Sequence, residues 1–154
     1  MTDLSLEAEE ARARIAFENP VSTPPLNFHT LRVQNVSRKI RWHGEADEWS
    51  GADWSNAMAG ETGEACNIVK KLRRHETGIG AGPQAYPGMR DPSGSGMPYN
   101  TPPPDELLPA LAEELADVVT YADLVAHKYG IDLGRAVREK FNRVSEAQGF
   151  PERL

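Results

Sequence analysis

Two helical segments of the chain carry acidic side chains where apolar side chains are expected. In residues 52–74, apolar positions recur at about 100° per residue and form one arc of a helix. Glu61 projects into the middle of that arc, and Glu64 lies at its edge. The arc is formed by Trp54, Ala57, Met58, Ala65, Ile68 and Leu72. If this helix packs through its apolar face, the carboxylates of Glu61 and Glu64 lie within or beside the packed surface.

A second segment, residues 105–128, repeats the arrangement. Its apolar stripe has Glu114 inside it and Asp117 just beside it, whereas Glu113 and Asp123 project away from it. The stripe is formed by Leu107, Leu111, Val118, Ala122 and Val125. The acidic residues of this segment are therefore not equivalent, and Glu114 and Asp117 are the pair expected at the packed face.

Acidic pairs at packed faces need a compensating charge. An ionised carboxylate in an apolar interface costs several kcal/mol when nothing compensates it, and two pairs on facing helices also raise each other's pKa values. The E-x-x-E spacing of Glu61 and Glu64 and the E-x-x-D spacing of Glu114 and Asp117 place each pair one turn apart. Because oxygen ligands suit hard cations, the pattern predicts a site for magnesium or manganese rather than zinc.

Two other interpretations use the same residues. The acids can be edge residues that pair with Lys or Arg, which a single E-x-x-E would favour. A di-iron carboxylate bundle would instead require Glu-x-x-His motifs. None of the four histidines, His29, His43, His75 and His127, stands three residues after an acidic residue. The metal-binding interpretation needs both pairs, and the sequence contains both.

The rest of the chain predicts an all-α protein. Helical segments are expected at about 27–42, 52–74, 105–128 and, capped by Asp132, up to about 147, with Asp105 capping the third. No alternating strand pattern or internal repeat is present. We therefore expect one helical domain over 27–150, folded as a four-helix bundle. It is preceded by an extension over 1–26, interrupted by a Gly/Pro-rich loop at 76–104 and followed by a tail at 151–154.

Composition narrows the class of partner and the compartment. The chain has 154 residues, a formal net charge of −6 and no block of basic residues, which argues against a nucleic-acid polymer as partner. No run of 18 apolar residues exists, so neither a membrane span nor a signal peptide is expected. The single cysteine, Cys66, excludes an intramolecular disulfide. We expect a cytoplasmic protein.

Two stretches of the chain resemble a known enzyme family. WSGADWSNAMAGETGEACNIVKKLRR and the later LAEELADVVTYADLVAHKYGIDLGRAVREKFNRVSEAQGF are similar to the MazG-like, all-α nucleoside triphosphate pyrophosphohydrolases. The resemblance covers residues 28–150, with the Gly/Pro-rich loop as an insertion. It rests on G-E-x-G-E-A and E-E-L-A-D-V in this order. It implies a four-helix protomer that assembles into dimers or tetramers.

The resemblance also implies a reaction and a set of site residues. Magnesium would be held by Glu61, Glu64, Glu114 and Asp117, and water would attack a nucleoside triphosphate to release pyrophosphate and a monophosphate. Either Glu61 or Glu64 would also orient or deprotonate the water. The K-F-N of the last helix makes Lys140 and Asn142 candidates for phosphate or sugar contacts. Lys140 borders that helix's apolar stripe, whereas Asn142 projects away from it.

Further candidates follow from helical projection, each with an alternative. Lys71 and Asn67 lie on the Glu64 side of their helix, where they could contact substrate, although Lys71 also suits a solvated helix end. Trp49 could stack on a base or pack at the helix start. Asn35 is a more speculative substrate contact, and Tyr121 borders the metal face as a supporting residue. Trp54 is expected in the core.

The expected function is magnesium-dependent hydrolysis of ribo- or deoxynucleoside triphosphates, in control of the nucleotide pool. The alternative is a non-catalytic nucleotide-binding or protein-interaction bundle. A phosphohydrolase with another cleavage point, or one that prefers a diphosphate, is a third possibility. The Gly/Pro-rich loop is either a lid over the substrate or an insertion without that role.

Overall fold

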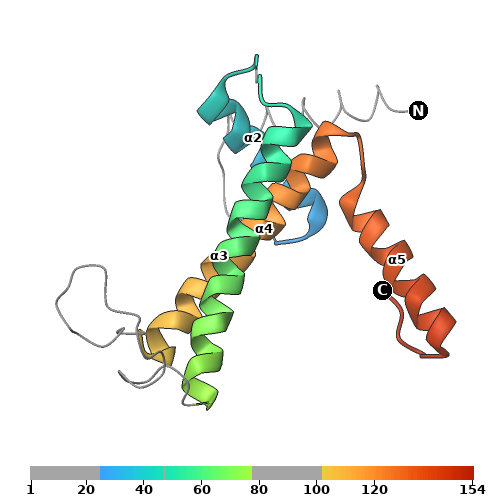
Figure 1. Cartoon of the computed structure of the whole chain (residues 1–154). Coiled ribbons are helices and arrows are strands. Elements are labelled where there is room, and N and C mark those ends of the chain that lie inside the picture. Colours follow the sequence, from blue (N-terminus) through green and yellow to red (C-terminus); the bar gives the residue numbers. More distant parts are fainter. Residues whose placement is uncertain (1–24, 47, 78–101) are drawn as a thin grey trace. The chain divides into compact units, whose positions relative to one another are not determined.

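The computed structural model describes residues 25–46, 48–77 and 102–154, and the regular structure in them is helical. In these described residues, four helices follow one another (Figure 1). They are α2 (Phe28–His43), α3 (Gly51–Thr77), α4 (Pro104–Lys128) and α5 (Leu133–Gln148). The all-α class and the four helical segments are thereby confirmed. Nearly all of the predicted N-terminal extension, and most of the Gly/Pro-rich loop, lie outside the described residues.

Side-chain caps set where three of the helices begin. The Asn27 side chain accepts a hydrogen bond from Thr30 N (2.9 Å), and Thr30 Oγ1 accepts one from Asn27 N (2.9 Å). Ser50 and Asp53 form a similar reciprocal pair before α3. Asp132 accepts from Arg135 N at 2.8 Å, which confirms it as the cap of α5.

The start of α4 differs from the prediction. The helix begins at Pro104, and the carbonyl of Pro103 accepts hydrogen bonds from the N–H groups of Glu106 and Leu107. Asp105 therefore lies in the first turn and is not the cap. The reason is that proline suits the first helical position, since its missing N–H would have no partner there.

The chain divides into two compact units, Met1–Ala57 with Val119–Leu154, and Met58–Val118. The first unit contains α2, α5, the beginning of α3 and the end of α4. Its core includes Val36, Trp54 and Leu124, all at most 5% exposed, as expected for Trp54. Polar residues share this core: Arg32, Asn35, Asp123 and His127 are buried.

Asp123 corrects an interpretation made from the sequence. It lies off the apolar stripe of α4, as projection predicts, yet its side chain is 1% exposed because α2 covers that face. The apolar stripe of α4 was used to decide which acidic residues are packed, and that criterion is wrong for Asp123. A helix packed on two faces shows only its more apolar face in the periodicity of the sequence.

The second unit consists, in its described part, of the remainder of α3 and the beginning of α4. Its buried apolar residues are Ala65 and Ile68 on α3 and Leu107 on α4. At the other end of the α3 segment, a ring nitrogen of His75 lies 2.8 Å from the carbonyl oxygen of Pro102. None of the described helices combines the length and apolar character needed to cross a bilayer.

Candidate metal centre

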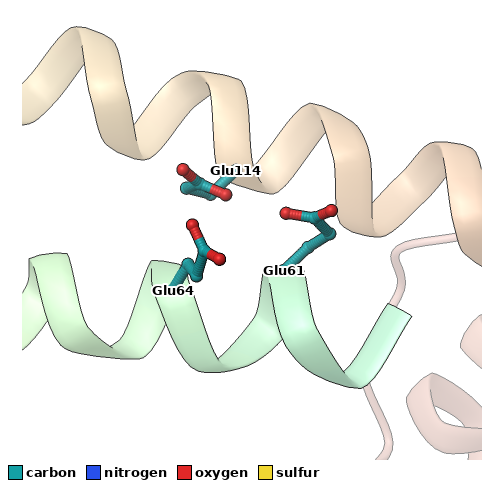
Figure 2. Close-up of side chains that lie close together, drawn as sticks. All are labelled: Glu61, Glu64 and Glu114. Carbon is teal, nitrogen blue, oxygen red and sulfur yellow. The ribbon is translucent and has the colours of Figure 1, made fainter. Parts of the chain in front are cut away.

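Three of the four predicted acidic ligands meet in the second unit. Glu61 and Glu64 extend from α3 toward Glu114 on α4 (Figure 2). One carboxylate oxygen from each residue can be chosen so that all three lie within 4.8 Å of one another. The three-residue spacing on α3 places its two carboxylates on one side of the helix, where they face Glu114. The prediction that the two helices bring their acids together is confirmed for these three residues.

Asp117 stands apart from this group. Its side chain is exposed, and it is not one of the three residues whose oxygens gather. Its charge nevertheless contributes to the potential at Glu114, whose pKa it helps to raise. Its assignment as a fourth metal ligand stays a prediction.

The pKa of Glu114 is raised above its ordinary value, and the causes describe the site. Partial burial is the largest cause, followed by a hydrogen bond with Glu61 and by the negative charges of Glu64, Glu61 and Asp117. Each cause disfavours the ionised form of Glu114. The arrangement is thus a concentration of negative charge that is only partly solvated, since Glu61 and Glu114 are half-buried while Glu64 is exposed.

Within the described residues, no basic side chain neutralises the negative charge of these three glutamates. No ion pair joins Glu61, Glu64 or Glu114 to a Lys or Arg among the residues that the structure describes. The alternative interpretation, in which these acids are edge residues held by basic partners, therefore has no support in that part of the chain. Three carboxylates from two helices are a donor set that fits a hard divalent cation.

An open hollow of about 440 Å³ runs along α3 beside Glu64. It is lined by Gly60, Gly63, Glu64, Cys66, Asn67 and Lys70. Asn67 therefore lies beside Glu64, as projection predicts. Lys70 and Cys66 were not among the predicted site residues. The sequence feature that could have indicated this hollow is the pair of glycines. Gly60 and Gly63 leave open space on the surface of α3 where larger residues would place side chains.

Among the described residues, no ion pair engages the ammonium group of Lys71 or of Lys140. Lys71 lies on α3 in the second unit and is half-buried, whereas Lys140 lies on α5 in the first unit and is exposed. The assignment of both lysines as phosphate or sugar contacts stays a prediction.

The other predicted substrate contacts lie in the first unit and have protein partners there. The Asn142 side chain donates to the carbonyl of Leu154 (3.3 Å) and accepts from its N–H (2.9 Å). The Asn35 amide donates to the Thr120 carbonyl (2.8 Å) and to Asp123 (3.2 Å). Both amides are thus engaged in holding the fold.

The aromatic residues pack together. Trp49 lies 4.4 Å from Trp54 and 4.9 Å from His43 between ring centroids, and Tyr121 lies 6.2 Å from Trp54. This favours the packing role of Trp49 over base stacking, although the residue is still 36% exposed. Tyr121 supports the Trp54 ring of the first unit.

Comparison of the chain with protein-family models, with curated proteins and with solved structures gave no match. The family resemblance therefore rests on the sequence motifs and their spacing.

Proposed function

We propose that this protein is a magnesium-dependent nucleoside triphosphate pyrophosphohydrolase of the MazG-like type, which converts a ribo- or deoxynucleoside triphosphate to the monophosphate and pyrophosphate. The observation that carries the proposal is the meeting of Glu61, Glu64 and Glu114 within 4.8 Å, without a basic partner in the described chain. A site with this much unbalanced negative charge destabilises the fold unless a cation occupies it. In the proposed enzyme, this negative charge would bind the magnesium ion.

The side chains divide the work in the proposed reaction. Glu61, Glu64 and Glu114 would hold the ion, with Asp117 beside them. Bound magnesium would neutralise phosphate oxygens and acidify water. Glu61 or Glu64 accepts the proton of the attacking water, and exposed Glu64 has the easier access to solvent. Asn67 and Lys70, which line the hollow next to Glu64, would donate to phosphate oxygens, with Lys71 on the same helix.

The proposal also covers the oligomeric state and the cellular location of the enzyme. The protomer would assemble as a homodimer or homotetramer and would act in the cytoplasm on the nucleotide pool. Support for assembly comes from large apolar side chains left on the surface, such as Leu108, Leu115 and Phe141, which are 40–56% exposed.

The deciding experiment measures pyrophosphate release from each canonical ribo- and deoxynucleoside triphosphate, with magnesium and with chelator. We expect chelator-sensitive release and a monophosphate product from at least one nucleotide. Glu61→Gln and Glu114→Gln should each lower kcat at least about 100-fold, since each removes charge that would hold the ion. Glu113→Gln is the matched control, because Glu113 is an exposed neighbour of Glu114 on the same helix.

Three results would count against the proposal. Full activity in both the Glu61 and Glu114 variants would remove the carboxylates from the site. Release of orthophosphate in place of pyrophosphate would change the cleavage point. Nucleotide binding by folded protein without any turnover would leave the non-catalytic bundle as the function.

A further inference from the structure

The second half of α3 carries basic side chains next to the hollow that Glu64 borders. Lys70 lines the hollow, and Lys71 and Arg74 follow it on the same helix, all in the second unit. Helical projection puts Asn67, Lys70 and Arg74 within about 60° of one another. The row of residues that lines the hollow therefore continues past Lys70 to Arg74. We call Lys70, Lys71 and Arg74 the α3 basic cluster.

Within the described residues, no carboxylate forms an ion pair with the α3 basic cluster. Glu76, the acidic residue that follows it on α3, accepts from Arg73, with Nη1 and Oε2 2.8 Å apart. Asp105 and Glu106 lie in the first turn of α4 and are not paired with the cluster. Two members of the cluster are nevertheless half-buried. Because a partly desolvated cation favours an anion beside it, the cluster is suited to an anionic ligand.

The helix dipole explains only part of this arrangement. Cations are favoured in the last turn of a helix, and Arg74 lies there. Lys70 lies about two turns before the end of α3 at Thr77, where the effect of the dipole has faded. The dipole also gives no reason for Lys70 and Arg74 to share the side of α3 that bears the hollow.

The charge along the hollow changes sign from Glu64 to the α3 basic cluster. Side chains of an α-helix lean toward its N-terminus, so those of Lys70 and Arg74 lean toward Glu64. At about 1.5 Å of rise per residue, the Cα atom of Lys70 is about 9 Å and that of Arg74 about 15 Å beyond that of Glu64 along the axis. Long basic side chains that lean back shorten these gaps. A ligand that follows this side of α3 therefore meets carboxylates first and cations further along.

We propose that the α3 basic cluster is a subsite for the terminal phosphates of a polyphosphate chain, and that it selects substrates by the length of that chain. The inference rests on the proposed function, in which the glutamates hold magnesium at the other end of the chain. The β- and γ-phosphates of a nucleoside triphosphate extend toward the cluster, whereas a diphosphate extends less far. Arg74 suits this role because its guanidinium donates two parallel hydrogen bonds to phosphate, and the lysines add charge. The substrate class is thus a nucleotide with at least three phosphates.

Isothermal titration calorimetry of the full chain with inorganic phosphates, at constant excess magnesium, tests the subsite without turnover. We expect tripolyphosphate to bind more tightly than pyrophosphate, and pyrophosphate more tightly than orthophosphate. Lys70→Gln and Arg74→Gln should each raise the Kd of tripolyphosphate at least about 10-fold, because each removes a charge-assisted hydrogen bond to phosphate. Circular dichroism establishes that both variants keep their helices.

Two further variants separate the subsite from general charge. Arg73→Gln is the matched control, since Arg73 projects about 100° away from Arg74 and is paired with Glu76. It removes the same charge from the same turn and should leave the Kd of tripolyphosphate unchanged. Lys70→Arg keeps the positive charge and should bind more tightly than Lys70→Gln. In kinetics with a nucleoside triphosphate, Lys70→Gln and Arg74→Gln should raise KM.

The possible results distinguish this inference from the proposed function. Wild-type protein that does not bind tripolyphosphate, folded Lys70→Gln and Arg74→Gln variants with the wild-type Kd, or an equal loss of affinity in Arg73→Gln would overturn the subsite. Pyrophosphate release that continues alongside such a result would leave the proposed reaction intact. Tripolyphosphate binding that depends on Lys70 and Arg74, in a protein that hydrolyses no nucleotide, would support the subsite and count against the reaction.

Discussion

The Nε atom of Arg32 on α2 lies 2.8 Å from Oδ1 of Asp123 on α4, with the two side chains 6% and 1% exposed. Asn35 donates to the other carboxylate oxygen, and a terminal nitrogen of Arg32 donates to the carbonyl of Ile131 after α4. This buried network fixes α2 on α4 within the first unit. Removing one member of this buried ion pair would leave a charge without its counterpart in a low dielectric.

We therefore expect Asp123→Ala to lower the free energy of unfolding by about 3–5 kcal/mol, since the Arg32 guanidinium would lose its carboxylate in the core. Urea unfolding followed by circular dichroism measures the change. Glu139→Ala is the control, because the Arg135–Glu139 pair is 4.0 Å long and exposed, and its loss should cost less than about 1 kcal/mol. Equal effects of the two substitutions would contradict the assigned role of the buried pair.

A second prediction concerns the pH dependence that Glu114 imposes. Its pKa is raised in the folded chain, so the folded state binds the proton more tightly than the unfolded state does. Ionised Glu114 is therefore destabilising above its raised pKa, and this penalty is relieved as the pH falls from that value toward the ordinary value of 4.5.

Glu114→Gln should accordingly raise the melting temperature at pH 7 in chelator. The gain should shrink as the pH falls through the window between the raised and the ordinary pKa. Differential scanning calorimetry across pH measures both effects, with Glu113→Gln as the control. Added magnesium should raise the melting temperature of the wild-type protein more than that of the Glu114 variant, since mass action stabilises the form that binds the ion. A Glu114 variant less stable than wild type in chelator would refute this account of the site.

The carboxyl group of Asp53 has the opposite effect on the pH dependence of stability. Hydrogen bonds from the Ser50 side chain and backbone are the main causes of its lowered pKa. Its contribution to stability is therefore complete above the ordinary value of 3.8 and is lost as the pH falls through the lowered value. Asp53→Asn should destabilise the protein at neutral pH, and the difference from wild type should disappear in strong acid.

Acid titration of stability, monitored by helicity, measures this difference. Asp105→Asn serves as the control, because Asp105 lies in the first turn of α4 outside such a capping pair. A constant difference between Asp53→Asn and wild type from neutral pH to strong acid would show that the carboxylate charge is not the cause.

The sequence predicts local structure and the inner faces of the long helices well. Helical spacing locates all four helices to within a few residues, and it places Glu61, Glu64 and Glu114 on facing sides because α3 and α4 pack along their most apolar stripes. The same reasoning misses Asp123 and the full role of Asn35. Their burial depends on α2 crossing a second face of α4, and polar residues leave no periodic signal for such a face.

The prediction for Asn142 shows a second limit of sequence reasoning. A motif suggests which residues bind a substrate, but it does not show which backbone groups lie nearby. In the structure the amide pairs with both polar backbone groups of Leu154, twelve residues along the chain. Such a contact depends on the turn at Gly149, where α5 ends in a left-handed conformation, and on the path taken after it.

The last prediction separates stability from function at the hollow beside Glu64. Gly60 and Gly63 lie inside α3, and a Cβ atom at either position meets nothing within 4 Å. Glycine inside a helix costs about 0.5–1 kcal/mol relative to alanine because it loses more backbone freedom on folding. Gly63→Ala should therefore raise the free energy of unfolding by about that amount, measured by urea unfolding.

If the hollow receives the substrate, Gly63→Ala should impair activity although it stabilises the fold. An added methyl group at position 63 would reduce the space next to Glu64 and Asn67, so KM should rise while the fold becomes more stable. Ala59→Gly is the matched control on the same helix, outside the hollow, and should lower stability with KM unchanged. A Gly63→Ala enzyme with higher stability and wild-type KM would place the substrate elsewhere, and one with lower stability would mean that another group approaches Gly63.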